Sequence, residues 1–308
     1  MTLPEVTRIY QNHTFDSTRW RNFVPRDDDI VISTSYKSGT TWMQNIVAQL
    51  LFLGQEEVPF AWDVSPWIDT RLNRPIEEVM ADLQKQTHRR FLKTHLALDG
   101  IPFFSKVKYI VVAREARDVF MSWWNHYSNY VDAAYERMNN TPGRVGDPIP
   151  RCPNDINDYW RTWITRGWFA WECEGYPHSG NMHHTQTWWD FRHLDNILFV
   201  HFNDLLVDLE GEIGRVAAFL DLAVTADQIK TVAQAVSFTA LKRRATADPQ
   251  AAKDTWREGM ATFFNKGTNG RWHNVLSAEE VTMYEKTATK VLAPDCKRWL
   301  ELGRAAFR

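Results

Sequence analysis

The sequence Thr34-Ser-Tyr-Lys-Ser-Gly-Thr-Thr-Trp42 decides the fold of the first part of the chain. It follows the apolar run Ile30–Ser33, which is typical of a short buried strand, and it leads into the helix-like stretch Thr41–Phe52. A loop of small hydroxylated residues with one glycine and one lysine, placed between a strand and a helix, is typical of an anion-binding turn. The pattern therefore predicts a strand–loop–helix unit that holds a phosphate-like group.

The individual residues of this loop suit that task. Gly39 allows the backbone to approach a ligand closely, Ser38, Thr40 and Thr41 supply hydroxyl donors, and Lys37 adds a positive charge. Because the lysine precedes the glycine, the loop differs from the P-loop of nucleoside triphosphatases, in which lysine follows glycine. A turn that only caps a helix uses the same residue types and is the alternative for this stretch taken alone.

The composition sets the broad class of the protein. The 308 residues, 44% of them hydrophobic, are enough for a large core, and because no linker-like tract divides the chain, one domain over residues 1–308 is expected. The formal net charge of −2 gives no support for a nucleic-acid partner. The apolar stretches are too short for a membrane span, and three dispersed cysteines without a leader peptide favour a cytoplasmic protein.

Strand-like and helix-like segments alternate along the chain, which predicts an α/β fold with a central, mostly parallel sheet flanked by helices. Strands are expected at Ile30–Ser33, Arg90–Thr94, Lys108–Ala113 and Ile197–Phe202. Helices are expected at Thr41–Phe52, Ile76–Lys85, Ala116–Tyr130, Asn157–Glu174, Thr185–Phe191, Asp208–Leu220, Ala226–Val236 and Ala278–Leu292. Two segments with loop-forming residues, 139–154 and 263–274, are expected to be loops.

Two further groups of polar residues follow expected strands. Lys93 and His95 stand at the end of the second strand, and Arg114 follows the third, with Ser122 about two helical turns later. Because ligands bind beyond the carboxyl ends of strands in an open parallel sheet, we expect these side chains to face the same crevice as the first loop. A histidine there can act as a general base, and an arginine can grip a phosphate. The alternatives are a structural histidine and an arginine in a surface salt bridge.

With these motifs the chain resembles the cytosolic-type sulfotransferase family, which uses 3′-phosphoadenosine 5′-phosphosulfate (PAPS) as donor and releases 3′,5′-ADP (PAP). The resemblance rests on Tyr36-Lys-Ser-Gly-Thr-Thr-Trp42, Lys93-Thr-His95, Arg114 with Ser122, and Lys266-Gly-Thr-Asn-Gly-Arg-Trp272. The segment after Trp272 lacks the short dimer motif of animal members, which suggests a bacterial aryl or alcohol sulfotransferase-like member and leaves the oligomeric state open.

The resemblance implies a role for each matched residue. The catalytic set would be Lys37, Lys93, His95 and Ser122, with His95 taking the proton from an acceptor hydroxyl as its oxygen attacks sulfur in line. The donor would be held by Lys37, Ser38, Gly39, Thr40, Thr41, Trp42, Arg114, Ser122, Phe202, Phe238, Asn265, Lys266 and Gly267. Trp42 would stack on adenine, Arg114 and Ser122 would hold the 3′-phosphate, and residues 263–274 would cover the cofactor. No metal is required by this scheme, because lysine and arginine neutralise the ligand.

Two positions depart from the family pattern. Asn265 stands where the family usually has arginine, so one phosphate contact would come from elsewhere, with Arg271, Arg243 and Arg244 as candidates. Phe202 stands where the family often has a tyrosine near adenine.

The acceptor is expected to be a small alcohol or phenol, because many aromatic residues are available to line its pocket. The candidates are Phe23, Trp67, Trp123, Trp124, His126 and Trp168, and the segment 139–154 would be a lid over them. The alternative for any one of these residues is that it fills the core.

Two other functions were weighed against this one. A nucleotide kinase should have a P-loop lysine followed by serine or threonine and an acidic strand end for magnesium, and neither is evident. A catalytically silent nucleotide-binding protein would lose the base and the lysines, but Lys37, Lys93 and His95 are all present. A zinc site is not expected either, because the spacing of Cys173, His178, His183 and His184 matches no paired-ligand pattern.

Overall fold

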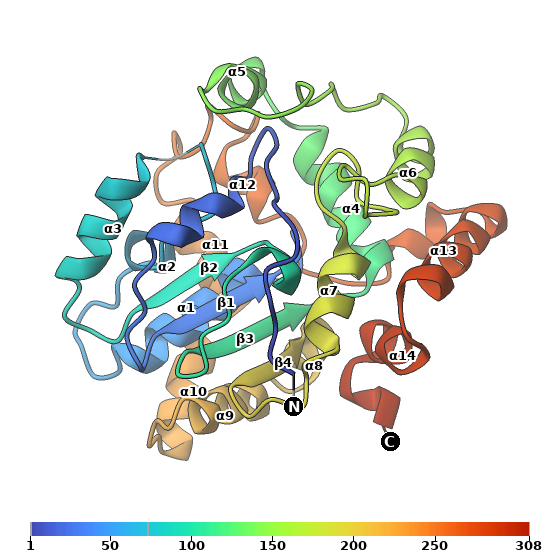
Figure 1. Cartoon of the computed structure of the whole chain (residues 1–308). Helices are drawn as coiled ribbons and strands as arrows, with labels where there is room; N and C mark the ends of the chain where they lie inside the picture. The colour runs from blue at the N-terminus through green and yellow to red at the C-terminus, as the bar shows by residue number, and fades with distance from the viewer. Residues whose placement is uncertain (1, 73, 308) are drawn as a thin grey trace.

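A four-stranded parallel sheet forms the centre of the computed structural model, which describes residues 2–72 and 74–307 (Figure 1). The strands are β1 (Ile30–Thr34), β2 (Phe91–Thr94), β3 (Lys108–Ala113) and β4 (Ile197–His201), and their order in the sheet is β2-β1-β3-β4. Every pairing is parallel, so the four carboxyl ends lie at one edge. The predicted α/β class and the four expected strands are confirmed.

Helices flank the sheet on both sides. The α-helices of the described residues are α1 (Thr40–Leu51), α2 (Ala61–Val64), α3 (Ile76–Lys85), α4 (Ala116–Tyr127), α5 (Asp132–Asn140), α6 (Ile156–Thr165), α7 (Asn181–Trp189), α8 (Phe202–Val207), α9 (Leu209–Phe219), α10 (Ala226–Ala235), α11 (Phe238–Ala245), α12 (Met260–Phe263), α13 (Ala278–Val291) and α14 (Pro294–Leu302). Short 3-10 helices cover Ser17–Asn22, Leu98–Gly100, Arg271–Asn274 and Gly303–Phe307. Among these residues no helix is long and apolar enough to cross a membrane.

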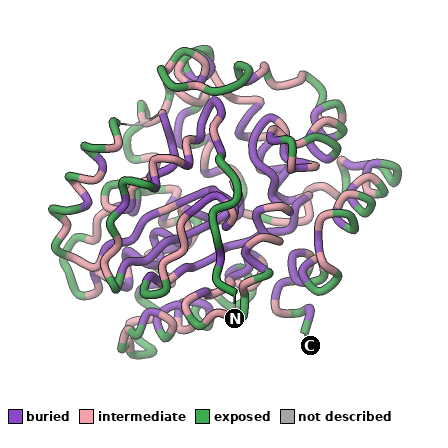
Figure 2. The backbone as a smooth tube through the Cα atoms, in the orientation of Figure 1, coloured by how far each residue is buried: buried purple, intermediate pink, exposed green. Residues whose placement is uncertain are grey.

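The sheet is buried on both faces, because successive strand residues point into different clusters. Ile30 and Ile32 of β1 pack with residues of α1, α9 and α10, whereas Val31 packs with aromatic residues of the N-terminal segment, among them Phe15 and Trp20. A third cluster joins α4, α6, α7, α13 and α14 beside the sheet. Figure 2 shows the result, with buried backbone through the strands and exposed residues on the outer helix faces.

One expected helix ends early, and an acidic residue of its expected range serves another helix. The helix expected over 157–174 ends at Thr165 as α6. The buried carboxylate of Glu174 instead accepts hydrogen bonds from the backbone N–H groups of Asn181 and Met182, at 3.1 and 2.9 Å. It thereby satisfies free donors at the start of α7, where negative charge also suits the helix dipole.

Other boundaries differ by a few residues, and several helices were not expected. The helix expected to reach Tyr130 ends at Tyr127, α7 starts at Asn181 rather than Thr185, and β4 ends at His201 because α8 begins at Phe202. The helices that the sequence did not predict are α2, α5, α8, α11, α12 and α14. Three of them, α2, α8 and α12, have six residues or fewer, too few for a helical period to be recognised, and α5, α11 and α14 are strongly polar in overall composition.

A buried ion pair joins the amino ends of β1 and β2. The Nε atom of Arg90 donates to Oδ1 of Asp29 at 2.7 Å, and Nη2 donates to the other carboxylate oxygen. The side chains are only 3% and 0% exposed. The same carboxylate also accepts from the backbone N–H of Arg26 at 2.7 Å. Loss of either partner would leave a charge buried without compensation.

We expect Asp29→Asn to lower the free energy of unfolding by about 3–5 kcal/mol, because Arg90 would keep its charge in a buried site. Urea denaturation measures the change. Asp27→Asn is the matched control: its pair with Lys106 is exposed, at 2.8 Å, and should cost no more than ~1 kcal/mol. Equal effects of the two substitutions would show that the buried pair contributes no more to the free energy of unfolding than the exposed pair does.

Candidate functional site

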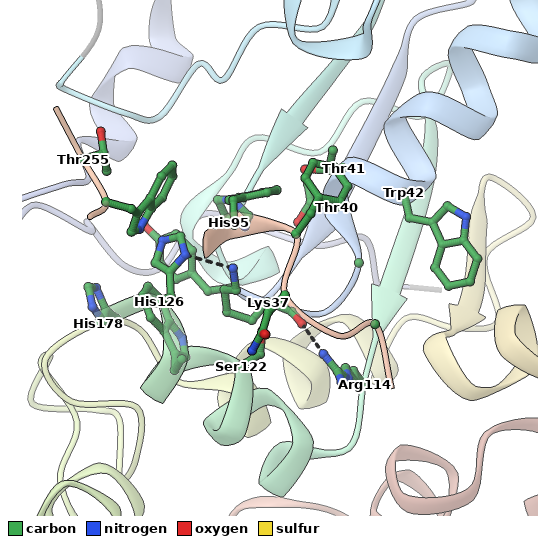
Figure 3. Close-up of a pocket in the computed structure, with 18 of the residues that line it drawn as sticks. Lys37, Thr40, Thr41, Trp42, His95, Arg114, Ser122, His126, His178 and Thr255 are labelled. Carbon is green, nitrogen blue, oxygen red and sulfur yellow. Dashed lines mark hydrogen bonds between the residues drawn. The ribbon is translucent and has the colours of Figure 1, made fainter. Parts of the chain in front are cut away.

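A pocket of about 580 Å³ lies at the carboxyl edge of the sheet. Side chains from each strand end line it: Lys37 after β1, His95 after β2, Arg114 after β3 and Phe202 after β4. Figure 3 shows the first three of these around one space, with Ser122 of α4 below Lys37. The parallel register therefore brings together residues that lie far apart in the sequence.

The first loop has the geometry of an anion-binding turn. Gly39 has φ +111°, a left-handed conformation, and a Cβ there would lie 3.0 Å from the ring of Phe202. Helix α1 begins at Thr40, and no side chain of the described residues caps it, so its first N–H groups face the pocket end of the loop. The hydroxyl of Ser38 forms a hydrogen bond with that of Ser35 at 2.7 Å, and Ser38 does not line the pocket. Among the loop residues predicted to contact the donor, Ser38 therefore has the least support from the structure.

Lys37 is the central cation of the pocket. Its Nζ atom lies 3.0 Å from Nδ1 of His126 and 4.6 Å from the ring centroid of Phe263. Its backbone has φ +64°, and its carbonyl accepts a hydrogen bond from Arg114 at 3.2 Å. Burial, together with the nearby charges of Arg114 and Lys93, lowers the pKa of Lys37 to about 7. An anionic ligand would raise the pKa of Lys37 again, because it favours the charged amine.

His95 is held with one ring nitrogen free to accept a proton. Its Nδ1 atom lies 2.9 Å from the carbonyl oxygen of Thr34, and because a carbonyl only accepts, Nδ1 carries the proton and donates it there. The Nε2 atom then has the lone pair. The ring stacks on Tyr36, with centroids 4.3 Å apart, and meets Trp67 edge-on at 5.0 Å. Burial, with a further contribution from Lys93, lowers the pKa of His95 well below 6.5, so the ring is neutral near pH 7.

Lys93 faces the same space from the neighbouring position. Its Nζ atom lies 4.8 Å from the ring centroid of Trp67, and burial lowers its pKa to about 8 against the opposing effect of Asp69. The buried carboxylate of Asp69 accepts from the indole N–H groups of Trp67 at 2.8 Å and Trp20 at 3.2 Å. Asp69 therefore fixes the indole that Lys93 contacts, a role that nothing in the local sequence indicated.

Arg114 ties the covering loop to the sheet. Its guanidinium donates to Oδ1 of Asn269 at 2.8 Å and to the carbonyl of Thr268 at 3.0 Å, and it lies 4.2 Å from the ring centroid of Phe202. The carboxylate of Asp118 accepts from the backbone N–H of Gly270 at 2.7 Å. These contacts tie residues 268–270 to Arg114 and to α4, and that residues 263–274 cover a bound cofactor stays a prediction.

Most predicted site residues lie together in this pocket. Its lining contains Lys37, Gly39, Thr40, Thr41, Trp42, Lys93, His95, Arg114, Ser122, Phe202, Phe238, Asn265, Lys266 and Gly267 from the catalytic and donor sets, and Trp67, Trp123 and His126 from the acceptor set. Of the three arginines considered as substitutes for the missing family arginine, Arg271 lines the pocket and has an Nε atom with no partner among the described residues. The roles of all these residues stay predictions.

Three predicted acceptor residues lie elsewhere. Phe23 is 5% exposed and packs against Trp20 in the core below β1 and β2, so its predicted contact with the acceptor is wrong. Trp168 stacks on Tyr176 outside the pocket lining. Trp124 does not line the pocket, and its ring centroid lies 6.2 Å from that of Tyr159 of α6.

The segment 139–154 does not line the pocket in the described structure. Arg71 anchors its start, donating to the carbonyls of Met138 and Pro142 at 3.1 Å each. The residues that cover the acceptor end are Ala134, Arg137 and Met138 of α5 together with Thr255 and Trp256. A lid function for 139–154 stays a prediction, and the observed cover comes from neighbouring segments.

Sequence reasoning also missed several lining residues. Tyr36, Tyr130, His178 and Trp256 line the pocket, and of these only His178 was considered, as a metal ligand. Tyr36 stands beside Lys37 in the first loop, but Tyr130, His178 and Trp256 follow no strand end, so no local pattern marks those three. His183 instead contacts Asp99 at 3.3 Å, and within residues 2–72 and 74–307 no group of three or more potential ligands could hold a metal ion.

Comparison with known proteins agrees with this geometry. A family model described as "Sulfotransferase domain" matches residues 27–294. A glycolipid sulfotransferase of Mycobacterium tuberculosis (strain ATCC 25177 / H37Ra) is 31% identical over 313 residues, covering 97% of this chain and 95% of the relative. Rat sulfotransferase 1A1 is 26% identical, covering 90% of this chain and 88% of the relative.

Solved structures share the fold. Mouse sulfotransferase SULT7A1 complexed with PAP has a TM-score of 0.68 at 20% identity, covering 92% of this chain and 90% of that chain. Retinol dehydratase in complex with retinol and PAP has a TM-score of 0.67 at 22% identity, covering 89% and 83%. At these identities the likeness establishes the architecture, while the family match carries the reaction class.

In the ligand-free protein we expect the amine of Lys37 to titrate near pH 7, because burial and neighbouring cations oppose its charge. Inorganic pyrophosphate should raise this pKa, since a bound anion favours the charged amine. NMR of protein isotope-labelled at lysine Cε follows the titration, and Lys37→Arg identifies the signal by its loss. A Lys37 signal that already titrates near 10.5 without ligand would contradict this description of the site.

Proposed function

Because the chain belongs to the sulfotransferase family, we propose that it transfers the sulfuryl group of PAPS to a hydroxyl of a small acceptor, with His95 as the general base. The observation that carries the proposal is the hydrogen bond from Nδ1 of His95 to the Thr34 carbonyl. It directs the free lone pair of Nε2 away from the sheet, in the same pocket as Lys37 and the anion-binding loop.

The donor would occupy the side of the pocket formed by the first loop and Arg114. The free N–H groups at the start of α1 and the amine of Lys37 suit a phosphosulfate, and Arg114 with Ser122 suits the 3′-phosphate. The aromatic rings of Trp42 and Phe238 offer faces for adenine. Arg271, which lines the pocket, would supply the phosphate contact that Asn265 does not. Two structural neighbours are complexes with PAP, which supports this choice of donor.

The reaction needs three things from this chain. His95 accepts the acceptor proton at Nε2 as the acceptor oxygen bonds to sulfur and the bond from sulfur to the phosphate oxygen breaks. Lys37, charged once an anion is bound, stabilises the negative charge that develops on the departing phosphate. Lys93 stabilises the sulfuryl oxygens from the other side. The donor supplies the activated sulfuryl group, and the proton on His95 returns to water.

The acceptor would occupy the aromatic side of the pocket. Tyr36, Trp67 and Trp123 present ring faces and edges there, which suits a phenol or an apolar alcohol. The mycobacterial relative is named as a glycolipid sulfotransferase, so a sugar hydroxyl on an apolar carrier belongs in the same acceptor panel. The cytoplasmic location stays a prediction. The oligomeric state is to be determined by measurement in solution.

We expect thermal stabilisation by 3′,5′-ADP but not by ATP with magnesium, because only the former carries the 3′-phosphate that Arg114 and Ser122 would hold. Ser122→Ala should weaken 3′,5′-ADP binding about 10-fold and leave 5′-AMP binding unchanged, since one charge-assisted hydrogen bond is lost. Calorimetric titration measures both ligands, and Ser128→Ala, at the C-cap of the same helix and outside the pocket lining, is the control. Stabilisation by ATP with magnesium alone would favour the kinase instead.

His95→Ala should reduce turnover of a phenol acceptor about 10²–10⁴-fold, while 3′,5′-ADP affinity changes less than about twofold. Because burial holds the pKa of His95 well below 6.5, kcat at saturating PAPS, where the bound donor keeps Lys37 charged, should stay level as the pH falls to 6.5 and decrease only near the lower pKa of His95. Steady-state assays across pH test both points, with His193→Ala at the surface as control. Near-normal turnover by His95→Ala would remove His95 as the base.

A further inference from the structure

The guanidinium of Arg114 is held in place by three hydrogen bonds. Its Nε atom donates to Oδ1 of Asn269 at 2.8 Å, Nη2 donates to the carbonyl of Thr268 at 3.0 Å, and Nη1 donates to the carbonyl of Lys37 at 3.2 Å. Figure 3 shows the last of these bonds. The ring of Phe202 lies against the guanidinium, with its centroid 4.2 Å from Cζ. Because a guanidinium has five N–H groups, two are left for a ligand in the pocket that Arg114 lines.

All three acceptors of Arg114 are electrically neutral. Two are backbone carbonyls and the third is a carboxamide, so no carboxylate is among its hydrogen-bond acceptors in the described part of the chain. The buried Arg90 differs, because its partner is the carboxylate of Asp29. Burial lowers the pKa of Arg114 to about 10 against the opposing effect of Asp118, so the side chain is charged at pH 7. The fold thus fixes the orientation of Arg114 and leaves its charge without a directly bonded counter-ion.

The orientation of the Asn269 carboxamide follows from its two partners. Arginine can only donate, so the amide oxygen faces Arg114, and Nδ2 donates to Oδ1 of Asn203, the second residue of α8. The backbone N–H of Asn203 in turn donates to Nδ1 of His201 at 3.1 Å. Nε2 of His201 carries the proton, because it lies 2.9 Å from the carbonyl oxygen of Leu300. A chain of hydrogen bonds therefore connects the end of β4 with the guanidinium at the end of β3.

We infer that Asn269 is a positioning residue for recognition of the sulfuryl donor. Its amide oxygen fixes Arg114 in the orientation in which the two remaining N–H groups hold the 3′-phosphate. Because the amide is neutral, it leaves the charge of Arg114 available to that phosphate. The inference rests on the proposed function and concerns how the same site distinguishes its donor from nucleotides without a 3′-phosphate.

Two substitutions at position 269 separate geometry from charge. Asn269→Ala removes the acceptor of the Arg114 Nε atom and should weaken binding of 3′,5′-ADP about 5-fold. Asn269→Asp has nearly the same shape but places a negative charge beside the 3′-phosphate, and it should weaken binding about 100-fold. Both variants should bind 5′-AMP within about twofold of the wild type, because this ligand lacks the 3′-phosphate. Calorimetric titration measures both ligands.

Asn274→Asp is the matched control. Asn274 is exposed in the same segment, so the substitution adds the same charge where water screens it, and binding of 3′,5′-ADP should change less than about twofold. The thermal midpoint without ligand shows whether each variant is folded. A steady-state assay adds a second readout: Asn269→Ala should raise KM for PAPS about 5-fold, and kcat at saturating PAPS should stay within about twofold of the wild type.

Each outcome of the titrations decides between stated alternatives. An unchanged ratio of the two affinities in Asn269→Asp would overturn the inference. Equal losses for 3′,5′-ADP and 5′-AMP would show that Asn269 only supports its loop, and would also overturn it. Tighter binding of 3′,5′-ADP by Asn269→Ala would mean that the amide competes with the phosphate for Arg114, the opposite of positioning. If the wild type did not distinguish the two ligands, the proposed function would fail, and the inference with it.

Discussion

The parallel register of the four strands is the constraint on which the site depends. Ser33 of β1 pairs with Thr94 of β2, and Thr34 of β1 pairs with Val112 of β3. These pairs lie at or next to the last residues of their strands. The residues that follow each strand therefore leave the sheet at the same edge. A shift of one residue would also exchange the two faces of a strand, and both faces are packed against apolar clusters. The core therefore fixes the register, and the register places the reactive groups.

The electrostatics of the pocket follow from that placement. Lys37, Lys93 and Arg114 converge on a buried space, and burial lowers the pKa of each. No aspartate or glutamate is among the residues that line the pocket in the described part of the chain. The three cations thus surround a space whose described lining has no acidic side chain. Such a preorganised site stabilises a bound anion without reorganisation of the protein. The same burial keeps His95 neutral, so one physical cause prepares both the cations and the base.

A larger share of the residues assigned to the donor than of those assigned to the acceptor lines the pocket, for a physical reason, and the roles themselves stay predictions. Residues such as His95 and Arg114 directly follow short apolar strands, and a parallel sheet converts that local position into a shared location. No such rule exists for the aromatic residues. Phe23 and Trp123 look equivalent in the sequence, yet the first packs below the sheet and the second faces the pocket. Their placement depends on helix phase and on long-range packing, and so does the role of Glu174, which lies beyond the end of α6 and accepts from backbone N–H groups at the start of α7.

Lys37 joins the two halves of the pocket. Its backbone is held by the hydrogen bond from Arg114, so its side chain turns about a fixed point on the donor side. The far end of that side chain touches His126, which belongs to the acceptor side, and Phe263, which begins the covering loop. An anion that attracts the amine must therefore draw it away from His126. Binding of the anion and loss of the contact with His126 thus involve the same amine. Because a single buried amine serves both partners, donor binding and the shape of the acceptor side are physically linked, and the strength of that link depends on how firmly His126 holds the amine when the donor is absent.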